Sequence, residues 1–228
     1  MAGRGERLKP DFPGIPKPFV RVAGKPALIW SLMGFDLSLF EEVIFITNKE
    51  TVDYRNPLDV ISSDIRVDTP MSMVVLDEVP NGQAHTLRLG LLESEVRDSF
   101  MVFNCDTYML GVDKSWMSKL EECKGAMGVF PSNNPGLSYA RIDDQGVVIE
   151  TAEKRVISKW ASTGLYWFHD VDSFLRLDLP IDCEAYIAPL YNQMIEKGQK
   201  IVGIPCKSFF PLGNKEEIET FERHISAP

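Results

Sequence analysis

Apolar residues follow two spacings along the chain. They recur at helical spacing in residues 27–40, 82–94, 116–124, 183–198 and 214–225. Short continuous apolar runs, typical of buried strands, occupy residues 42–47, 71–78, 99–109, 125–131, 162–168 and 200–206. Because runs and helical segments alternate, the pattern predicts an α/β fold with a mostly parallel sheet that is covered on both faces.

One stretch departs from this alternation. Residues 138–150 hold two short strand-like runs around Asp144-Gln145-Gly146, which predicts a β-hairpin. The last helix begins with Asn214 and Glu217 at the spacing of a capping box. We find no internal repeat and no low-complexity linker, so we expect residues 1–228 to form a single domain with a small antiparallel insertion.

Composition limits the class of protein. A chain of 228 residues with 44% hydrophobic residues can bury one substantial core. No apolar run approaches the roughly 20 residues that a bilayer span needs, and the amino terminus lacks the apolar core of a signal peptide. We therefore expect a cytoplasmic protein with no membrane partner. Four widely separated cysteines, in no CxxC pair, predict neither a zinc site nor a disulfide framework: Cys105, Cys123, Cys183 and Cys206.

Charge is distributed unevenly. The formal net charge of −9 argues against a nucleic acid as partner, because such proteins carry a broad basic face. The first 26 residues nevertheless hold six basic and only two acidic side chains. This local excess of positive charge indicates a small, highly charged anion as ligand.

The basic segment contains two closely spaced glycines. Gly3 and Gly5 leave room for backbone amides to approach an anion, and Arg7 and Lys17 supply charge-assisted donors. This composition predicts a phosphate-binding loop. A solvated surface turn has the same composition, so the glycines alone do not decide between the two.

The spacing of this segment resembles a known signature. The nucleotidyltransferases that make nucleotide sugars carry G-x-G-[ST]-R-L-x-P, then P-K-P and G-K-P. The matching positions here are Gly3, Gly5, Arg7, Leu8, Pro10, Pro16-Lys17-Pro18 and Gly24-Lys25-Pro26. Glu6 stands where Ser or Thr is usual, and Asp11-Phe12 where Leu-Thr is common.

Later segments resemble the same family in the same order. They are Asn81-Gly82-Gln83-Ala84, Asn104-Cys105-Asp106-Thr107, Glu153-Lys154, Ser162-Thr163-Gly164-Leu165-Tyr166 and Leu212-Gly213-Asn214. The resemblance implies a Rossmann-like sheet of the GT-A type. It also implies transfer of a nucleotidyl group from a nucleoside triphosphate onto a phosphorylated small molecule, usually a sugar 1-phosphate.

The resemblance also implies roles for particular residues. Catalytic roles fall to Arg7, Lys17 and Asp106, with Asp106 as a ligand of Mg²⁺. Nucleotide binding falls to Ala2, Gly3, Arg4, Gly5, Gly82 and Gln83. Acceptor binding falls to Lys154, Thr163, Gly164 and Glu184. Structural alternatives stay open: a capping turn at Asp106, solvated surface at Lys154, a helix start at Gly82 and close packing at Gly164.

The proposed chemistry needs few protein groups. A phosphate monoester has a second pKa of about 6 and is mostly a dianion at neutral pH, so it can attack a phosphorus atom without a general base. This suits a chain whose three histidines, His85, His169 and His224, form no motif. Two polyanions repel each other, so we expect catalysis by positioning and by charge stabilisation from a metal ion and basic side chains.

Two positions depart from the family. The family carries a second metal-binding aspartate two residues before the glycine of its D-[IV]-G-T-P segment, and this chain has Pro211 there. Glu184 or Asp182 could replace it, or substrate phosphates and water could complete the coordination. The family also has an apolar strand before the glycine loop, whereas this sequence starts at Met1-Ala2-Gly3. We expect an incomplete amino terminus, and an unstable or inactive product if the strand is truly absent.

Three functions are compared on this basis. The first is a Mg²⁺-dependent nucleotidyltransferase that uses CTP, GTP or UTP. The second is a nucleotide-binding or regulatory protein without catalysis, which Pro211 and the missing strand favour. The third is a GT-A glycosyltransferase, which would need no pyrophosphate-stabilising Arg7 and Lys17. The sequence leaves the nucleotide, the acceptor and a homo-oligomeric state open.

Overall fold

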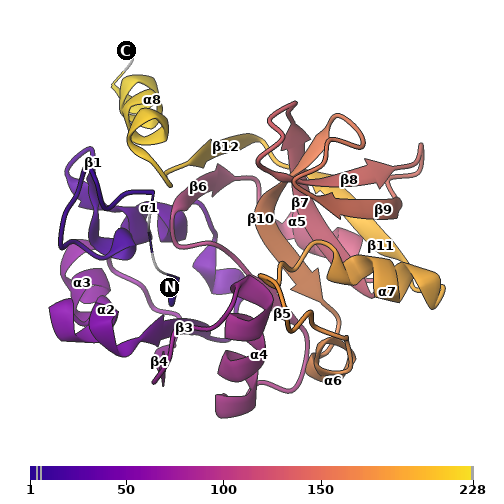
Figure 1. Ribbon diagram of the computed structural model, residues 1–228, viewed down its shortest axis with the longest axis horizontal. Coiled ribbons are helices and arrows are strands. Elements are labelled where there is room, and N and C mark those ends of the chain that lie inside the picture. The colour runs from indigo at the N-terminus through magenta and orange to yellow at the C-terminus, as the bar shows by residue number, and fades with distance from the viewer. Residues whose placement is uncertain (4, 6, 227–228) are drawn as a thin grey trace. The chain divides into compact units, whose positions relative to one another are not determined.

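The chain divides into two compact units. The computed structural model describes residues 1–3, 5 and 7–226 (Figure 1). Unit 1 comprises Met1–Val79, Asn104–Gly111 and Ser208–Pro228. Unit 2 comprises Pro80–Phe103 and Val112–Lys207.

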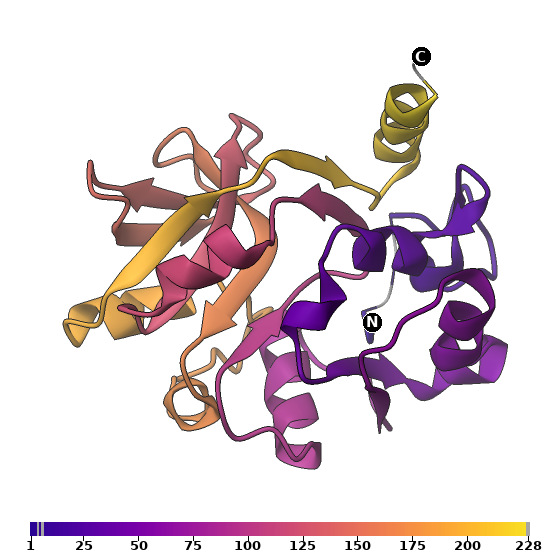
Figure 2. The ribbon, with the colours of Figure 1, turned by 180° about the vertical axis from the view of Figure 1, so that it is seen from behind.

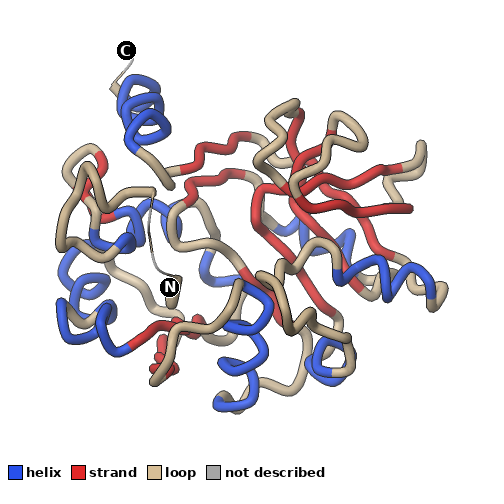
Figure 3. Tube along the Cα trace, viewed as in Figure 1, coloured by secondary structure: helices blue, strands red, loops and turns tan. Residues whose placement is uncertain are grey.

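Unit 1 is built from short helices and strand pairs (Figure 3). Its elements are η1 (Lys17–Phe19), β1 (Arg21–Val22), β2 (Lys25–Pro26), α1 (Ala27–Met33), η2 (Leu37–Leu39), β3 (Val43–Asn48), α2 (Lys49–Tyr54), α3 (Pro57–Asp64), β4 (Met71–Leu76), β6 (Thr107–Leu110), β12 (Ser208–Pro211) and α8 (Lys215–Ile225). Strands β3 and β4 are parallel, and β6 and β12 are antiparallel.

The amphipathic helix α8 closes one core of unit 1. Its Ile218 and Phe221 are buried and pack with Leu8, Val20 and residues near them. The ring of Phe221 meets the ring of Trp30 edge-on, with 4.9 Å between centroids. Burial of this aromatic and aliphatic face, rather than intrinsic propensity, stabilises α8.

Unit 2 holds a six-stranded sheet. Its elements are α4 (Gln83–Glu93), β5 (Phe100–Val102), α5 (Lys114–Met117), η3 (Ser118–Leu120), β7 (Gly125–Pro131), β8 (Ser138–Ile142), β9 (Val148–Glu153), β10 (Trp160–Phe168), α6 (Val171–Leu175), α7 (Leu190–Glu196) and β11 (Ile201–Pro205). The strand order is β11-β7-β10-β8-β9, and β5 also pairs with β10. Helix α7 lies against β9 and β11, as the view from behind shows (Figure 2).

The predicted hairpin is confirmed and forms β8 and β9. The Asp143 carboxylate accepts hydrogen bonds from the backbone N–H groups of Gln145 and Val147, both at 2.9 Å. Gly146 adopts φ +82°, which a glycine reaches without a steric penalty. The turn residues therefore fix the register of the hairpin.

The α/β class is confirmed, but the sheets are mixed. Among the described strands the parallel pairs are β3 with β4 and β7 with β11, and the other strand pairs are antiparallel. The antiparallel pairs arise because the hairpin β8–β9 adds to the sheet beside β10 and because β10 itself runs opposite to β7. An apolar run predicts a strand but not its direction.

Several predicted boundaries are wrong. The helix expected over residues 183–198 begins only at Leu190, because Pro189 disfavours a helical conformation in the residue before it. The run 99–109 is divided into β5 and β6 by a turn at Cys105 and Asp106. Residues 27–40 end their α-helix at Met33, and residues 116–124 become the short helices α5 and η3.

Two simpler expectations concern the cysteines and the membrane. All four cysteines are free thiols, as their spacing predicts. Among the described residues, no helix has both the length and the apolar character that crossing a membrane requires.

Candidate functional site

Asp106 is held beside Gly213 by strand pairing within unit 1. The antiparallel pair β6–β12 sets Thr107 opposite Pro211, and the N–H of Leu212 donates to the carbonyl of Asp106 at 2.8 Å. Pro211 occupies the last position of this ladder, where a missing N–H is tolerated. The backbone therefore brings residues 212–213 next to Asp106 although the side chain at position 211 offers no ligand.

Four charged side chains gather in unit 1, and we call them the Gly213 cluster: Arg7, Lys17, Asp106 and Glu217. A Cβ atom on Gly213 would lie 3.1 Å from Arg7 Nη2, 3.1 Å from Asp106 Oδ2 and 3.2 Å from Glu217 Oε2. The absent side chain thus leaves a space that one cation and two carboxylates face.

Lys17 and Asp106 form a direct ion pair within this cluster. Their side chains are 23% and 13% exposed, and Lys17 Nζ contacts Asp106 Oδ2. Burial lowers the pKa of Lys17, but the charges of Asp106 and Cys105 and the hydrogen bond to Asp106 together raise the pKa above its ordinary value of 10.5. The sequence predicted both residues as catalytic, and the structure brings them together. Their binding of substrate stays a prediction.

The glycine loop precedes this pair. Gly5 has φ +62°, and a Cβ there would lie 3.4 Å from Lys17 Cβ. The carbonyl of Gly5 accepts the N–H of Leu8 at 3.0 Å, so the loop turns back on itself and buries Leu8. Ala2 is buried and Gly3 is exposed. Arg4, predicted to bind nucleotide, lies outside the described residues.

Glu217 is a functional candidate that the sequence reasoning missed. Asn214 caps helix α8 by accepting the N–H of Glu217 at 3.0 Å, and Glu217 Oε2 in turn accepts the N–H of Gly213 at 2.8 Å. The capping spacing in the sequence explained Glu217 as a structural residue. Only the β6–β12 pairing, which is remote in sequence, shows that the same carboxylate faces Asp106 across Gly213.

Unit 2 holds a second group of charged residues, the Lys154 cluster: Glu153, Lys154, Glu184 and Tyr186. Lys154 Nζ donates to Tyr186 Oη at 2.5 Å, and the Tyr186 hydroxyl donates to Glu184 Oε2. The hydrogen bond that Lys154 donates to Tyr186 raises the pKa of Lys154, and the charges of Glu184 and Glu153 raise it further. The structure thus places the predicted acceptor residues Lys154 and Glu184 in one network.

Glu153 lies at the inner side of this cluster. Ser138 Oγ donates to Glu153 Oε2, and burial raises the pKa of the Glu153 carboxyl. The nearby Glu184 carboxylate acts in the same direction, whereas Lys154 and the Ser138 hydrogen bond oppose it. A partly buried carboxylate that already has a hydroxyl partner is suited to accept further hydroxyl donors.

Gly82, the residue before Gln83 at the start of helix α4, packs against the segment that carries Glu184. The N–H of Ala185 donates to Asn81 O at 3.0 Å, and the N–H of Ala84 donates to Ala185 O at 2.9 Å. Gly82 has φ +104°, and a Cβ there would lie 2.5 Å from backbone atoms of Ala185. The glycine is therefore required by close packing, and the predicted nucleotide contact at this position stays a prediction.

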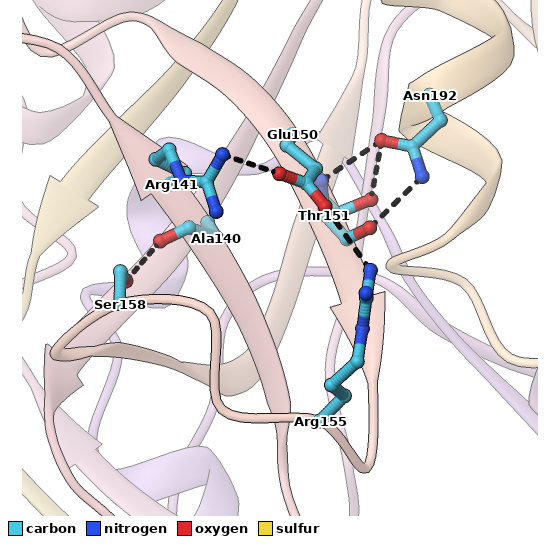
Figure 4. A network of polar contacts seen from close by, with 7 residues as sticks. All are labelled: Ala140, Arg141, Glu150, Thr151, Arg155, Ser158 and Asn192. Atoms are coloured by element: carbon cyan, nitrogen blue, oxygen red, sulfur yellow. Dashed lines mark hydrogen bonds and ion pairs between the residues drawn. The ribbon is translucent and has the colours of Figure 1, made fainter.

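Strand β9 is hydrogen-bonded to helix α7 at Thr151, just before Glu153 and Lys154. Thr151 donates its N–H to Asn192 Oδ1 at 2.8 Å, and Asn192 Nδ2 donates to Thr151 O at 2.9 Å (Figure 4). Thr151 Oγ1 also donates to Ala188 O at 2.7 Å. Since Asn192 belongs to α7, this contact ties the strand with Lys154 to the helix that follows Tyr186.

Arg155, the basic residue that follows Lys154, pairs with a carboxylate outside the Lys154 cluster. Arg155 Nη2 lies 3.1 Å from Glu150 Oε1, and Arg141 Nη1 lies 2.8 Å from Glu150 Oε2 (Figure 4). These exposed pairs contribute little stability. They direct Arg155 toward Glu150, so Lys154 rather than Arg155 supplies the cation of the Lys154 cluster.

Thr163 and Gly164 lie in a bulge of β10. The register between β10 and β7 shifts between Ser162 and Tyr166, and Gly164 has φ +80°. Thr163 is 1% exposed, and its Oγ1 occupies the space above Gly128. Bulges of this kind redirect a strand next to functional sites, but acceptor binding by these two residues stays a prediction.

A family model and a solved structure both match nearly the whole chain. A family model described as nucleotidyl transferase matches residues 1–214. No curated protein sequence matches the chain. The solved nucleoside-diphosphate-sugar pyrophosphorylase from Vibrio cholerae is 27% identical, with a TM-score of 0.83 and coverage of 98% of both chains.

Two more distant structures share the fold. The inositol-1-phosphate CTP transferase from T. maritima is 16% identical, with a TM-score of 0.74 over 98% of this chain and 91% of that one. HddC from Yersinia pseudotuberculosis, solved with GMP-PN, is 18% identical, with a TM-score of 0.69 over 93% and 91%. The Rossmann-like nucleotidyltransferase fold implied by the sequence is confirmed.

Proposed function

The chain belongs to the nucleotidyl transferase family, and we propose that it moves a nucleoside monophosphate from a nucleoside triphosphate onto the phosphate of a small phosphorylated acceptor. The observation that carries the proposal is the Gly213 cluster. Arg7, Asp106 and Glu217 converge on the space over Gly213, and Lys17 is paired with Asp106. Cations beside carboxylates suit a triphosphate that arrives with a divalent ion.

The reaction follows from the charges of the two substrates. An oxygen of the acceptor phosphate dianion forms a bond to the α-phosphorus of the triphosphate. The bond from that phosphorus to the oxygen bridging toward the β-phosphorus breaks, and pyrophosphate leaves with the electron pair. No proton has to be removed from the nucleophile, so the protein's contribution is alignment and charge stabilisation.

The residues around Gly213 fit a magnesium ion. Mg²⁺ is commonly held by one or two carboxylates together with substrate phosphates and water, and the Asp106 and Glu217 oxygens both face the space that a Cβ on Gly213 would fill. When bound there, the ion would neutralise phosphate charge. Asp106 and Glu217 are its proposed ligands, which removes the need for an aspartate at position 211.

The remaining residues have the following roles on this proposal. Arg7 and Lys17 bind the triphosphate and stabilise the departing pyrophosphate. The backbone of Ala2, Gly3 and Gly5 contacts the nucleotide phosphates, and Gly82 and Gln83 contact the nucleoside. In unit 2, Lys154 binds the acceptor phosphate, and Glu184, Thr163 and Gly164 line the place of the acceptor.

A sugar 1-phosphate is the proposed acceptor. The structure at 27% identity is named a nucleoside-diphosphate-sugar pyrophosphorylase. The Lys154 cluster supports this choice because it offers one cation for a phosphate and the carboxylates Glu153 and Glu184 for hydroxyl groups. On this proposal the chain supplies a nucleotide sugar for polysaccharide synthesis in the cytoplasm.

Pyrophosphate release tests the proposal. Purified protein with Mg²⁺ is assayed over a matrix of nucleoside triphosphates and phosphorylated sugars, with Asp106→Ala as the inactive variant. Asp53→Ala is the matched control, since Asp53 forms an exposed pair with Lys49 in the same unit. We expect release with one pairing of substrates, abolished in Asp106→Ala alone. Release without an acceptor, or equal release from both variants, would contradict the proposal.

A further inference from the structure

Lys154 has an unusual backbone conformation. It directly follows strand β9 and has φ +50°, in the left-handed region that a residue with a side chain seldom adopts. Its N–H donates to Leu137 O at 3.0 Å, which holds this conformation in place. Such backbone strain persists where the surrounding structure imposes it and is frequent at functional positions.

The side chain of Lys154 makes two contacts with Tyr186. Nζ donates to Tyr186 Oη at 2.5 Å and lies 4.7 Å from the centroid of the Tyr186 ring. The same hydroxyl donates its proton to Glu184 Oε2. The order of donors is therefore lysine to tyrosine to glutamate, with the phenol between the two charged groups.

Tyr186 is itself on a fixed segment. The residue before it, Ala185, forms backbone hydrogen bonds with Asn81 and Ala84. Helix α7, which follows, is tied to β9 through Asn192 and Thr151 (Figure 4). The two ends of the Lys154–Tyr186 contact are thus anchored to the same strand-and-helix frame within unit 2.

We propose that Tyr186 is a positioning residue that holds the Lys154 ammonium group ready for the acceptor phosphate while keeping it apart from Glu184. The inference rests on the proposed function, in which Lys154 binds that phosphate. It assigns a role to a residue that no pattern in the sequence singles out.

The phenol serves this purpose better than a direct ion pair. An ammonium group has three donors, and the contact with Tyr186 uses one of them, which leaves two that can point to phosphate oxygens. The phenol carries no charge, because burial and the Glu184 carboxylate raise its pKa above the ordinary value. The titratable groups that face Lys154 are Glu153, Glu184 and Tyr186.

The first experiment measures the chemical reactivity of Lys154 and does not depend on catalytic turnover. Acetic anhydride acylates unprotonated lysine, and mass spectrometry gives the rate at Lys154 in the substrate-free protein as a function of pH. We expect Tyr186→Phe to move the Lys154 profile to lower pH and to raise its rate about threefold or more at mildly alkaline pH, since the hydrogen bond that stabilises the charged form is lost. Glu184→Gln should shift the profile in the same direction by less.

Tyr54→Phe is the matched control. Tyr54 is 49% exposed in unit 1 and stacks on Phe19, and removing its hydroxyl should leave the Lys154 profile unchanged. If the Lys154 profile is the same in the wild type, Tyr186→Phe and Tyr54→Phe, the inference is wrong, whatever the enzyme turns over.

The second experiment separates binding of the two substrates. In the enzyme as it turns over, Tyr186→Phe should raise the KM for the acceptor about tenfold and leave the KM for the nucleoside triphosphate unchanged. A residue that only supports folding would change both values or lower the melting temperature instead. An unchanged acceptor KM would overturn the positioning role with the proposed function intact, whereas absence of turnover in the wild type would refute the proposed function and leave the acylation result to decide on the contact.

Discussion

The molecule places two lysines in very different electrostatic settings. Lys17 of the Gly213 cluster contacts the Asp106 carboxylate directly, and both side chains are largely buried. Lys154 is exposed and is linked to Glu184 through the Tyr186 hydroxyl. The direct pair holds Lys17 beside Asp106, a proposed metal ligand, where the triphosphate is proposed to bind. The phenol between Lys154 and Glu184 leaves two donors of the Lys154 ammonium group for the acceptor phosphate. The two lysines are therefore suited to different tasks.

The comparison predicts the largest effect at Asp106. Asp106→Asn should lower kcat/KM on the order of 10³-fold, because it removes a proposed metal ligand. It should also cost about 3 kcal/mol in the free energy of unfolding, since Lys17 loses its charged partner in a largely buried site. Turnover and chemical denaturation measure the two effects.

Asp53→Asn should change neither quantity, because Asp53 is 60% exposed and its pair with Lys49 lies at the surface. Equal losses in both variants would mean that the Gly213 cluster has no special role.

The next effect concerns the frame of the Lys154 cluster. Gly82→Ala should lower the free energy of unfolding by about 3 kcal/mol, because φ is +104° and the new Cβ would meet the Ala185 backbone at 2.5 Å. Thermal or chemical denaturation gives the value. Gly146→Ala separates the two causes, since Gly146 has φ +82° with nothing within 4 Å of a Cβ, and should cost only about 1 kcal/mol.

If Gly82→Ala loses no more free energy of unfolding than Gly146→Ala, the backbone at Ala185 can move aside for the new Cβ at little cost. The segment that carries Tyr186 would then be less firmly held than the positioning role requires.

A smaller effect is expected at Glu217. Glu217→Gln should weaken Mn²⁺ binding about tenfold, as measured by the loss of the free-ion electron paramagnetic resonance signal on titration. The amide can still accept the N–H of Gly213, so the start of α8 should be preserved. Glu216→Gln removes the same charge from the same helical turn at an exposed position and should leave Mn²⁺ binding unchanged. If Mn²⁺ binding is weakened equally in both variants, the cause is the lost negative charge at the start of α8 and not a ligand role of Glu217.

The smallest effect is a difference in alkaline stability. The pKa of Lys17 is raised in the folded chain, so its contribution is fully present below the ordinary lysine pKa of 10.5 and is lost as the pH rises through the folded value. Lys17→Arg should lose less stability over that range, because arginine stays charged. Denaturant midpoints measured from neutral to strongly alkaline pH give both curves. Parallel curves would contradict a stabilising Lys17–Asp106 pair.

The sequence predicted some parts of this picture well. The apolar runs at residues 42–47, 71–78 and 125–131 all become strands, because a continuous buried run carries its own signal. The Asp144-Gln145-Gly146 turn locates the hairpin for the same local reason. Arg7, Lys17 and Asp106 were singled out because their segments resemble the signature of a known family, and the structure gathers them in unit 1.

Other parts depend on contacts between distant positions. Glu217 faces Asp106 only because β12 pairs with β6, and no local pattern reports that pairing. Tyr186 meets Lys154 because Asn192 fastens α7 to β9, and the sequence predicted a helix at residue 186, where the chain is irregular. The direction of each strand also depends on pairing between distant positions. The mixed sheets were therefore not predicted.

The most direct test of the account follows the phosphates themselves. The chain is given its preferred acceptor with a nucleoside triphosphate labelled either at the α- or at the γ-phosphate, and the products are separated. We expect the α-label to enter the acceptor product and the γ-label to leave in pyrophosphate. Transfer of the γ-label to the acceptor, or its release as single phosphate, would contradict attack at the α-phosphorus and with it the roles given to both lysines.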